Sequence, residues 1–427
     1  MKKFFSGLLA VVLCMSSLGG LAPVHAQDVE MAESNIIEGQ YIIALNDGLA
    51  QNSEVEMALD GGAALEALGA TVLDNLEEST QVDGMGTMAE EQAEPAWMAD
   101  LGDIYLVEYQ SENNEGAAEL QAKLEEKGFD VRYIEPNQEV EAYEMDTVDA
   151  YAVNPQQTWH YNMVKAPQAW QTTIGSRNVA IAILDTGLDH NNPSISPFVD
   201  MARAKSFVGG DTMDRQGHGT HVTGTIVSTG VVSGVMQEAT VFPVKVLGDD
   251  GRGSTYGIQQ GIIYATRANA WAINMSLGGG GYSQGMDEAC AAAQQAGVVV
   301  VAAAGNSGTG SISYPAKYES VIAVGALDAN QARAYYSQYG QGLEVMAPGS
   351  GIYSTFLNNS FKKLSGTSMA TPHVVGVVGL IRSANPNLNA YQVREILRNT
   401  AVSIGNTNEY GYGLVDAEAA VLRALQN

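Results

Sequence analysis

The stretch Gly366-Thr-Ser-Met-Ala-Thr-Pro-His-Val374 decides how the rest of the chain is read. Its serine, Ser368, lies between a turn of small residues and a long apolar run, 374–381, that predicts a buried helix. A serine at a helix start caps that helix, and the positive end of the helix favours negative charge nearby. Taken alone, Ser368 is most simply an N-cap. The other motifs decide whether it is more than that.

The C-terminal two thirds of the chain alternates apolar strands with helices. Strands are expected at residues 178–184, 240–247, 272–276, 297–303 and 320–325. Apolar strands buried on both faces and separated by helices predict an α/β fold, a parallel sheet with helices on both sides. In such sheets the functional groups collect beyond the carboxyl ends of the strands.

Polar residues whose side chains could take part in catalysis or metal binding stand at these strand ends and helix starts. Asp185 and Asn306 each follow an apolar strand, and His218 and His221 lie in a glycine-flanked helix start, Gly217-His-Gly-Thr-His-Val-Thr-Gly224. Taken singly, each of these residues has a purely structural explanation, either as a residue that forms a turn or as a helix residue whose polar atoms are hydrogen-bonded within the fold. A zinc site at the two histidines is the weaker reading, because their spacing is three rather than four and no glutamate lies between them.

Together these residues form a specific pattern. An acid, a base and a serine occur in the chain order Asp, His, Ser, which is one of the known orders of the catalytic triad. With Ser276-Leu-Gly-Gly279, Ala304-Gly-Asn306 and Tyr314-Pro-Ala316, the three triad motifs resemble the subtilisin-like serine proteases over roughly residues 154–420. Two alternative functions fit the sequence less well. An esterase or lipase would place its serine in Gly-x-Ser-x-Gly, whereas Ser368 lies in Gly-Thr-Ser-Met-Ala. An inactive binding protein would not need Asp185, His218, Ser368 and Asn306 all intact.

The resemblance implies a role for each residue of the pattern. Ser368 would attack the peptide carbonyl, His218 would act as base and then acid, and Asp185 would hold the imidazole. Asn306 and the backbone N–H of Ser368 would stabilise the oxyanion. His221 is expected to be structural.

The resemblance also implies how a substrate binds. It would lie as an added β-strand between two backbone segments and place one side chain in a pocket. The segments and the pocket comprise Gly251, Arg252, Gly253, Ser276, Leu277, Gly278, Ala304, Gly305 and Ser313. Because small residues line this pocket, a large apolar or aromatic side chain is expected there. Arg252 at the rim favours acidic side chains nearby.

The N-terminus is typical of a secretory signal peptide, residues 1–26. Lys2 and Lys3 precede an apolar run, 4–21, and small residues lead to Val24-His25-Ala26. Since no second apolar segment of spanning length follows, a secreted extracellular protein is expected rather than a membrane-anchored one. After signal removal only Cys290 remains, so no intramolecular disulfide is expected, and Cys290 is interpreted as a buried hydrophobe rather than a nucleophile.

The charge divides the remaining chain into two parts. Residues 27–143 carry 28 acidic and 3 basic side chains, whereas residues 144–427 carry 20 and 16. Neither part is basic, which argues against nucleic acid or a membrane as partner. The acidic part has the order βαββαβ, a ferredoxin-like α+β arrangement interrupted by an expected loop, 80–102.

This acidic part contains no cysteine or histidine, so no chemistry of its own is expected. It resembles the inhibitory propeptide of the protease family, most clearly at 40–45 and 131–143. Residues 27–143 are therefore expected to be a folding chaperone and inhibitor of a catalytic domain, 144–427. Autocleavage is expected after Tyr143, with Met145 and Tyr151 as alternatives.

The last expectations concern metals and assembly. Many subtilisins bind calcium tightly through an aspartate where this chain has Ser194, and segment 228–233 is short, so this strong site is expected to be absent. A weak structural cation, calcium or sodium, remains an option at the carbonyls of Ala316, Tyr318 and Val321. No cofactor is required, and a monomer acting on proteins and peptides is expected.

Overall fold

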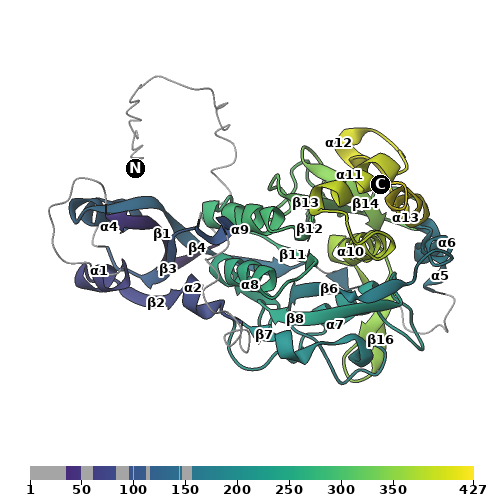
Figure 1. The fold of residues 1–427 in the computed structure, drawn as a ribbon, viewed down its shortest axis with the longest axis horizontal. Helices are drawn as coiled ribbons and strands as arrows, with labels where there is room; N and C mark the ends of the chain where they lie inside the picture. Colours follow the sequence, from purple (N-terminus) through teal and green to yellow (C-terminus); the bar gives the residue numbers. More distant parts are fainter. Residues whose placement is uncertain are drawn as a thin grey trace, which may run out of the picture.

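The computed structural model describes residues 35–49, 61–82, 96–99, 101–111, 116–143, 145–146 and 156–427. These residues form a small N-terminal body and a larger C-terminal body (Figure 1). The expected signal peptide, 1–26, and the alternative cleavage site Tyr151 lie outside them. No helix among the described residues is long and apolar enough to cross a membrane.

A seven-stranded sheet forms the centre of the larger body, in the order β14-β13-β12-β10-β6-β8-β7, and every pairing in it is parallel. The strands are β6 (Gly175–Asp185), β7 (Lys205–Ser206), β8 (Glu238–Lys245), β10 (Ala272–Met275), β12 (Val299–Ala303), β13 (Val321–Leu327) and β14 (Leu343–Pro348). The predicted α/β class is confirmed.

Helices cover both faces of this sheet (Figure 1). One face carries the buried helix α10 (Thr367–Ala384), beside α7 (His218–Ile226); the other carries α8 (Thr255–Arg267) and α9 (Gln284–Gln295). The rest of the body contains α5 (Thr158–Met163), α6 (Ala166–Ala169), α11 (Ala390–Thr400), α12 (Thr407–Tyr410), α13 (Ala417–Ala424), η1 (Ser196–Phe198) and η2 (Met201–Arg203). The simple capping role for Ser368 is wrong, because Gly366 is the N-cap of α10 and Ser368 lies inside the helix.

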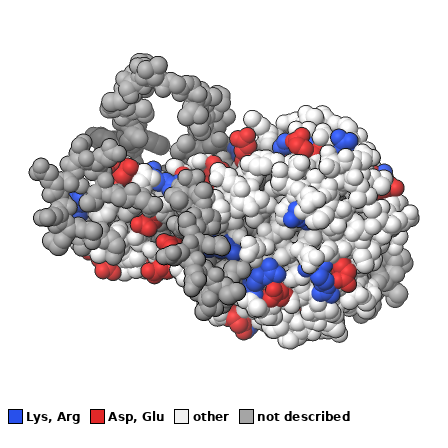
Figure 2. Space-filling model, viewed as in Figure 1, with Lys and Arg blue, Asp and Glu red and all other residues white. Residues whose placement is uncertain are grey.

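The N-terminal body is an antiparallel sheet with the strand order β4-β1-β3-β2. Its elements are β1 (Ile36–Leu49), α1 (Gly61–Ala67), β2 (Thr71–Asn75), α2 (Leu76–Ser79), α3 (Ala96–Ala99), β3 (Asp103–Glu108), α4 (Gly116–Glu126) and β4 (Phe129–Ala142). The predicted βαββαβ order is therefore confirmed for the strands and the two longer helices, and two short helices, α2 and α3, stand in addition between β2 and β3. Figure 2 shows acidic side chains together with basic ones on the visible part of this body, and both signs scattered over the larger one.

The two faces of the N-terminal sheet have different partners. Ile43 and Leu45 pack with Leu120 and Leu124 of α4 in a separate core. Ile42 and Ala44, which alternate with them along β1, belong to the core cluster shared with the larger body. One face of the sheet thus covers the helices α8 and α9.

Strand β4 is longer than the predicted strand 131–134. Its last residues leave their own sheet and pair antiparallel with β9 (Arg252–Ser254) and β11 (Leu277–Gly278) of the larger body. Beyond it, β5 (Met145–Asp146) pairs with β16 (Ser360–Ser365), which forms a hairpin with β15 (Ile352–Phe356). The chain therefore runs across the carboxyl edge of the parallel sheet.

The expected loop 80–102 is described only in part. Residues 80–82 follow α2, and α3 lies near the loop's end, so that part is helical rather than irregular. Residues 83–95 lie outside the described residues.

Candidate active site

Asp185 and His218 form a directly bonded pair at the carboxyl edge of the sheet. Asp185 is the last residue of β6, and His218 is the first residue of α7. The ring Nδ1 of His218 donates to Oδ1 of Asp185 at 2.8 Å, and both side chains are fully buried. The carboxylate thereby fixes the proton on Nδ1, which leaves Nε2 of the neutral ring as a base.

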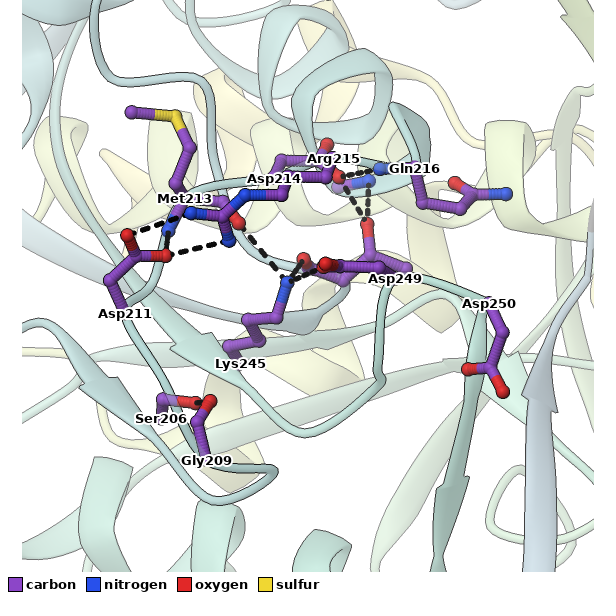
Figure 3. Close-up of polar contacts among 12 residues, drawn as sticks. Ser206, Gly209, Asp211, Met213, Asp214, Arg215, Gln216, Lys245, Asp249 and Asp250 are labelled. Atoms are coloured by element: carbon purple, nitrogen blue, oxygen red, sulfur yellow. Dashed lines mark hydrogen bonds and ion pairs between the residues drawn. The ribbon is translucent and has the colours of Figure 1, made fainter.

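A buried network behind this pair joins the two loops that carry it (Figure 3). Asp214 accepts hydrogen bonds from the Thr186 hydroxyl at 2.9 Å and the Gly217 N–H at 2.8 Å. The ammonium of Lys245 donates to the carbonyls of Thr186 and Met213, at 2.8 and 3.1 Å. Burial raises the pKa of the Asp214 carboxyl. Sequence reasoning missed Asp214 and Lys245, because neither stands in a recognisable motif.

The hydroxyl of Ser368 is held by the rim of the cleft. It donates to the carbonyl oxygen of Ser276 at 2.8 Å, and the Ser276 hydroxyl donates back to the carbonyl of Ser368 at 2.8 Å. Helix α10, which carries Ser368, packs directly against α7, which carries His218. The structure thus gathers three of the predicted catalytic residues at one edge of the sheet.

Asn306 is bound to the start of the same helix. Its Oδ1 accepts from the N–H and from the hydroxyl of Thr367, both at 2.9 Å, so it satisfies a backbone donor that Gly366 leaves unpaired. Its Nδ2 is buried, and no described residue accepts a hydrogen bond from it. The amide is therefore oriented with its N–H groups free for a negatively charged oxygen. Thr367, which provides this orientation, was not singled out from the sequence.

The predicted substrate-binding segments flank the end of β4. Ala142 and Glu141 pair with Leu277 and Gly278 of β11 on one side. On the other side Glu141 pairs with Arg252, and the N–H of Ala142 donates to the carbonyl of Gly251 at 3.1 Å. Residues 139–142 thus occupy the place expected for a substrate strand.

The side chain of Tyr143 fills the predicted pocket. A Cβ on Gly278 would lie 2.6 Å from Cε2 and 2.9 Å from the hydroxyl of Tyr143, so only glycine leaves room for the ring. The hydroxyl hydrogen-bonds with Ser313, and burial raises the pKa of Tyr143 to about 12. Ser313 also donates to Oε1 of Gln338 at 3.3 Å, and a Cβ on Gly305 would clash with that oxygen. Sequence reasoning missed Gln338, which comes from a distant loop.

The other predicted groups are accounted for outside the catalytic cluster. The Nε2 of His221 donates to the carbonyls of Ile352 and Lys362, at 2.9 and 3.0 Å. Cys290 is fully buried, and burial raises the pKa of its thiol well above the usual value. Among the described residues, no three His, Cys, Asp or Glu side chains group around a common point suited to a metal ion.

Two of the three carbonyls expected to hold a weak cation, those of Tyr318 and Val321, accept hydrogen bonds from other groups. The carbonyl of Tyr318 accepts from the N–H of Val321 at 3.0 Å, and the carbonyl of Val321 accepts from Nη2 of Arg394 at 3.0 Å. A second nitrogen of Arg394 donates to the carbonyl of Glu319 at 2.5 Å. The guanidinium thus competes with a cation for the carbonyl of Val321.

Comparison with known proteins agrees with this geometry. Residues 176–413 match the subtilase family. The chain is 43% identical to M-protease of Shouchella clausii over 297 residues, which cover 66% of this chain and 77% of that protein. It is 46% identical to Subtilisin BL of Lederbergia lenta over 268 residues, 61% of this chain and 97% of that protein. It is 41% identical to alkaline elastase YaB of a Bacillus species over 333 residues, which cover 75% of this chain and 85% of that protein.

The family match covers more than half of the chain and includes the Asp, His, Ser and Asn positions described above. The chain therefore belongs to the subtilase family and is a subtilisin-like serine endopeptidase.

Proposed function

We propose that the protein is a secreted zymogen that cleaves its own chain after Tyr143 and then hydrolyses proteins after large apolar or aromatic residues. The observation that carries this proposal is the place of residues 139–143. They lie as an antiparallel strand between β9 and β11, with the ring of Tyr143 beside Gly278 and its carbonyl oxygen beside Gly366. The first substrate is thus the chain itself.

The chemistry follows from the groups around this bond. The Ser368 hydroxyl turns from the carbonyl of Ser276 to Nε2 of His218, which takes its proton as the oxygen attacks the carbonyl carbon of Tyr143. The new C–O bond places negative charge on the Tyr143 oxygen, where Nδ2 of Asn306 donates. His218 then returns the proton to the leaving peptide nitrogen of residue 144, the C–N bond breaks, and water hydrolyses the acyl-enzyme by the same route.

The occupied subsites support a sequence preference. The pocket beside Gly278 and Ser313 takes an aromatic ring, and Val140, three residues before Tyr143, is also buried. Glu139 lies 3.5 Å from Arg252, so acidic side chains are favoured on that side of the cleft. This ion pair is exposed and contributes at most about 1 kcal/mol.

N-terminal sequencing of the secreted protein tests the proposal. A mature chain that starts at residue 144 supports it, and Ser368→Ala should remain one uncleaved chain. A first residue well beyond 154, or a Ser368→Ala chain that is processed normally, would contradict autocleavage at this site. Labelling by a fluorophosphonate, lost in Ser368→Ala, identifies the nucleophile independently, and sedimentation tests the expected monomer.

A further inference from the structure

We propose that strand β16 extends the substrate cleft on the leaving-group side, where Lys362 and Lys363 select acidic side chains. The inference rests on the proposed function and deepens it, because it concerns the residues that follow the scissile bond after Tyr143. The substrate class is an extended polypeptide that carries Asp or Glu at the fourth and fifth positions after the bond.

The register of β5 against β16 sets the path of the leaving-group strand. The two residues of β5 are the second and third after the proposed scissile bond, and they pair antiparallel with Ser365 and Leu364. These are two of the 6 residues of β16, whose opposite edge pairs with β15. A longer substrate in the same register therefore places its fourth residue opposite Lys363 and its fifth opposite Lys362.

The hairpin of β15 and β16 is tied to helix α7, whose first residue is the catalytic base. The hydroxyls of Ser354 and Thr355 donate to the carbonyls of His221 and Thr220, both at 2.8 Å. Nε2 of His221 also donates to the carbonyl of Lys362 at 3.0 Å. The backbone of β16 thus holds a fixed position relative to the catalytic base.

The side chain of Lys362 brings its charge close to the start of α7. Its Nζ lies 5.0 Å from the ring centroid of Phe356, within the range of a cation–π contact. That ring lies against Gly217, because a Cβ there would be 2.4 Å from its Cε2 and Cζ. Gly217 directly precedes His218. A positive charge is therefore held beside the catalytic helix, on the strand that pairs with the leaving-group residues.

The sequence after the proposed scissile bond has the opposite charge. Residues 144–149 include three acidic residues and no basic one. Lys362-Lys363 is, apart from Lys2-Lys3, the one place in the chain where two basic residues are adjacent. Opposite charges on facing residues of two antiparallel strands stabilise the pair, whereas like charges destabilise it. The chain's own leaving-group segment is thus the first example of the preferred substrate.

Quenched fluorescent peptides test this preference with the self-processed enzyme. All peptides carry the sequence of residues 140–143 before the scissile bond, and they differ only in the fourth and fifth residues after it, which are both Asp, both Asn or both Lys. The kcat/KM should be about two- to fivefold higher with Asp than with Asn, and lowest with Lys, as expected for charged pairs across two strands. Because these charges are near the surface, high salt should reduce the difference.

Replacement of both lysines by glutamine, Lys362→Gln with Lys363→Gln, should bring the three peptides to equal kcat/KM. A p-nitroanilide of residues 140–143 has no amino acid after the scissile bond, so its kcat/KM should stay within twofold in this variant. Lys205→Gln is the matched control, because Lys205 also lies on an edge strand, β7, with its ammonium near two aromatic rings. It should keep the preference for Asp.

If the double variant gives little folded protein, Lys363→Gln alone should remove the preference at the fourth position. Equal kcat/KM for the Asp and Lys peptides in the wild-type enzyme overturns the inference, and so does a preference that survives in both lysine variants. A wild-type chain that is never cleaved after Tyr143, and does not cleave any of these peptides after tyrosine, overturns instead the proposed function.

Discussion

The carbonyl oxygen of Tyr143 and the side-chain nitrogen of Asn306 both lie beside Gly366, next to the position that a Cβ would take. A Cβ built on Gly366 would lie 2.6 Å from the first atom and 3.0 Å from the second. Glycine therefore leaves the space that these two atoms need, at the start of the helix that carries Ser368.

Replacement of Asn306 by alanine should lower turnover with little change in KM. The buried Nδ2 has no acceptor among the described residues, so its hydrogen bond is available to the oxyanion and strengthens in the transition state. The expected loss in kcat is about 10²–10³-fold, the range known for the corresponding donor in subtilisin. Thr367→Val, which keeps the donor but weakens its orientation, should lose less. A change confined to KM would contradict the assignment.

Replacement of Gly366 by alanine should prevent self-processing. The added methyl group would lie only 2.6 Å from the Tyr143 carbonyl oxygen, so the scissile bond would be pushed away from Ser368. Gels should show the uncleaved chain, while far-UV circular dichroism remains that of the Ser368→Ala protein. Gly351→Ala is a suitable control, because a Cβ there meets no atom within 4 Å, although its positive φ costs some stability. Normal processing of Gly366→Ala would show that the carbonyl lies elsewhere.

Residues in local motifs were predictable from the sequence, whereas contacts between distant segments were not. Asp185 and His218 stand at a strand end and a helix start, and apolar periodicity places both at one edge of the sheet. The extension of β4 beyond Ile134 depends on edge strands more than 100 residues away, so no local pattern reports it. No local pattern reports the contact of Gln338 with Ser313 below the pocket either, because the two residues come from separate segments of the chain. Ser368 was mistaken for a possible cap because position in the sequence does not show which residue starts the helix.

The buried histidines should make the folded protein sensitive to mild acid. Nδ1 of His160 and Nε2 of His373 lie 2.9 Å apart in the core, and burial lowers the pKa of His373 to about 4 and that of His221 to about 3. In the unfolded chain these side chains bind protons near pH 6.5, so the unfolded state holds more protons below that pH. Their contribution to stability is full above pH 6.5 and is lost as the pH falls towards 4.

Urea unfolding of the Ser368→Ala chain, which cannot digest itself, measures this effect. Between pH 6.5 and 5 the free energy of unfolding should fall by about 1 kcal/mol per buried histidine per pH unit. His160→Phe, which keeps a ring at this site, should reduce the slope. A free energy that stays constant from pH 8 to 5 would be inconsistent with neutral buried histidines.

The floor of the pocket should distinguish tyrosine from phenylalanine. Ser313 hydrogen-bonds with the hydroxyl of Tyr143 and is itself tied to Gln338. Ser313→Ala should therefore lower kcat/KM for peptides with tyrosine before the scissile bond by about fivefold, and leave phenylalanine peptides nearly unchanged, since one neutral hydrogen bond contributes about 1 kcal/mol. Equal losses for both peptides would indicate a general effect on the pocket.

Removal of metal ions should change the stability very little, because a side-chain amide, that of Gln157, joins the segments around Ser233 and Tyr353. Gln157 donates from Nε2 to the carbonyls of Ser233 and Tyr353, at 3.2 and 3.1 Å, and its Oε1 accepts from the N–H of Ser233 at 3.0 Å. The N–H of Thr229 donates to the carbonyl of Ser194 at 2.9 Å, which fixes the segment 228–233 against Ser194 without a metal ion between them.

In the Ser368→Ala chain, EDTA should shift the Tm by less than about 2 °C, below the effect of 1 kcal/mol in a body of this size. Gln157→Ala removes these three hydrogen bonds and a fourth, to the hydroxyl of Tyr161. At about 1 kcal/mol each, their loss should lower the Tm by roughly 8–16 °C, with or without EDTA. Lys317→Ala, which leaves Gln157 untouched, serves as the comparison. If EDTA alone lowered the Tm by as much as Gln157→Ala, and added calcium restored it, a metal ion rather than the amide would be the link between these segments.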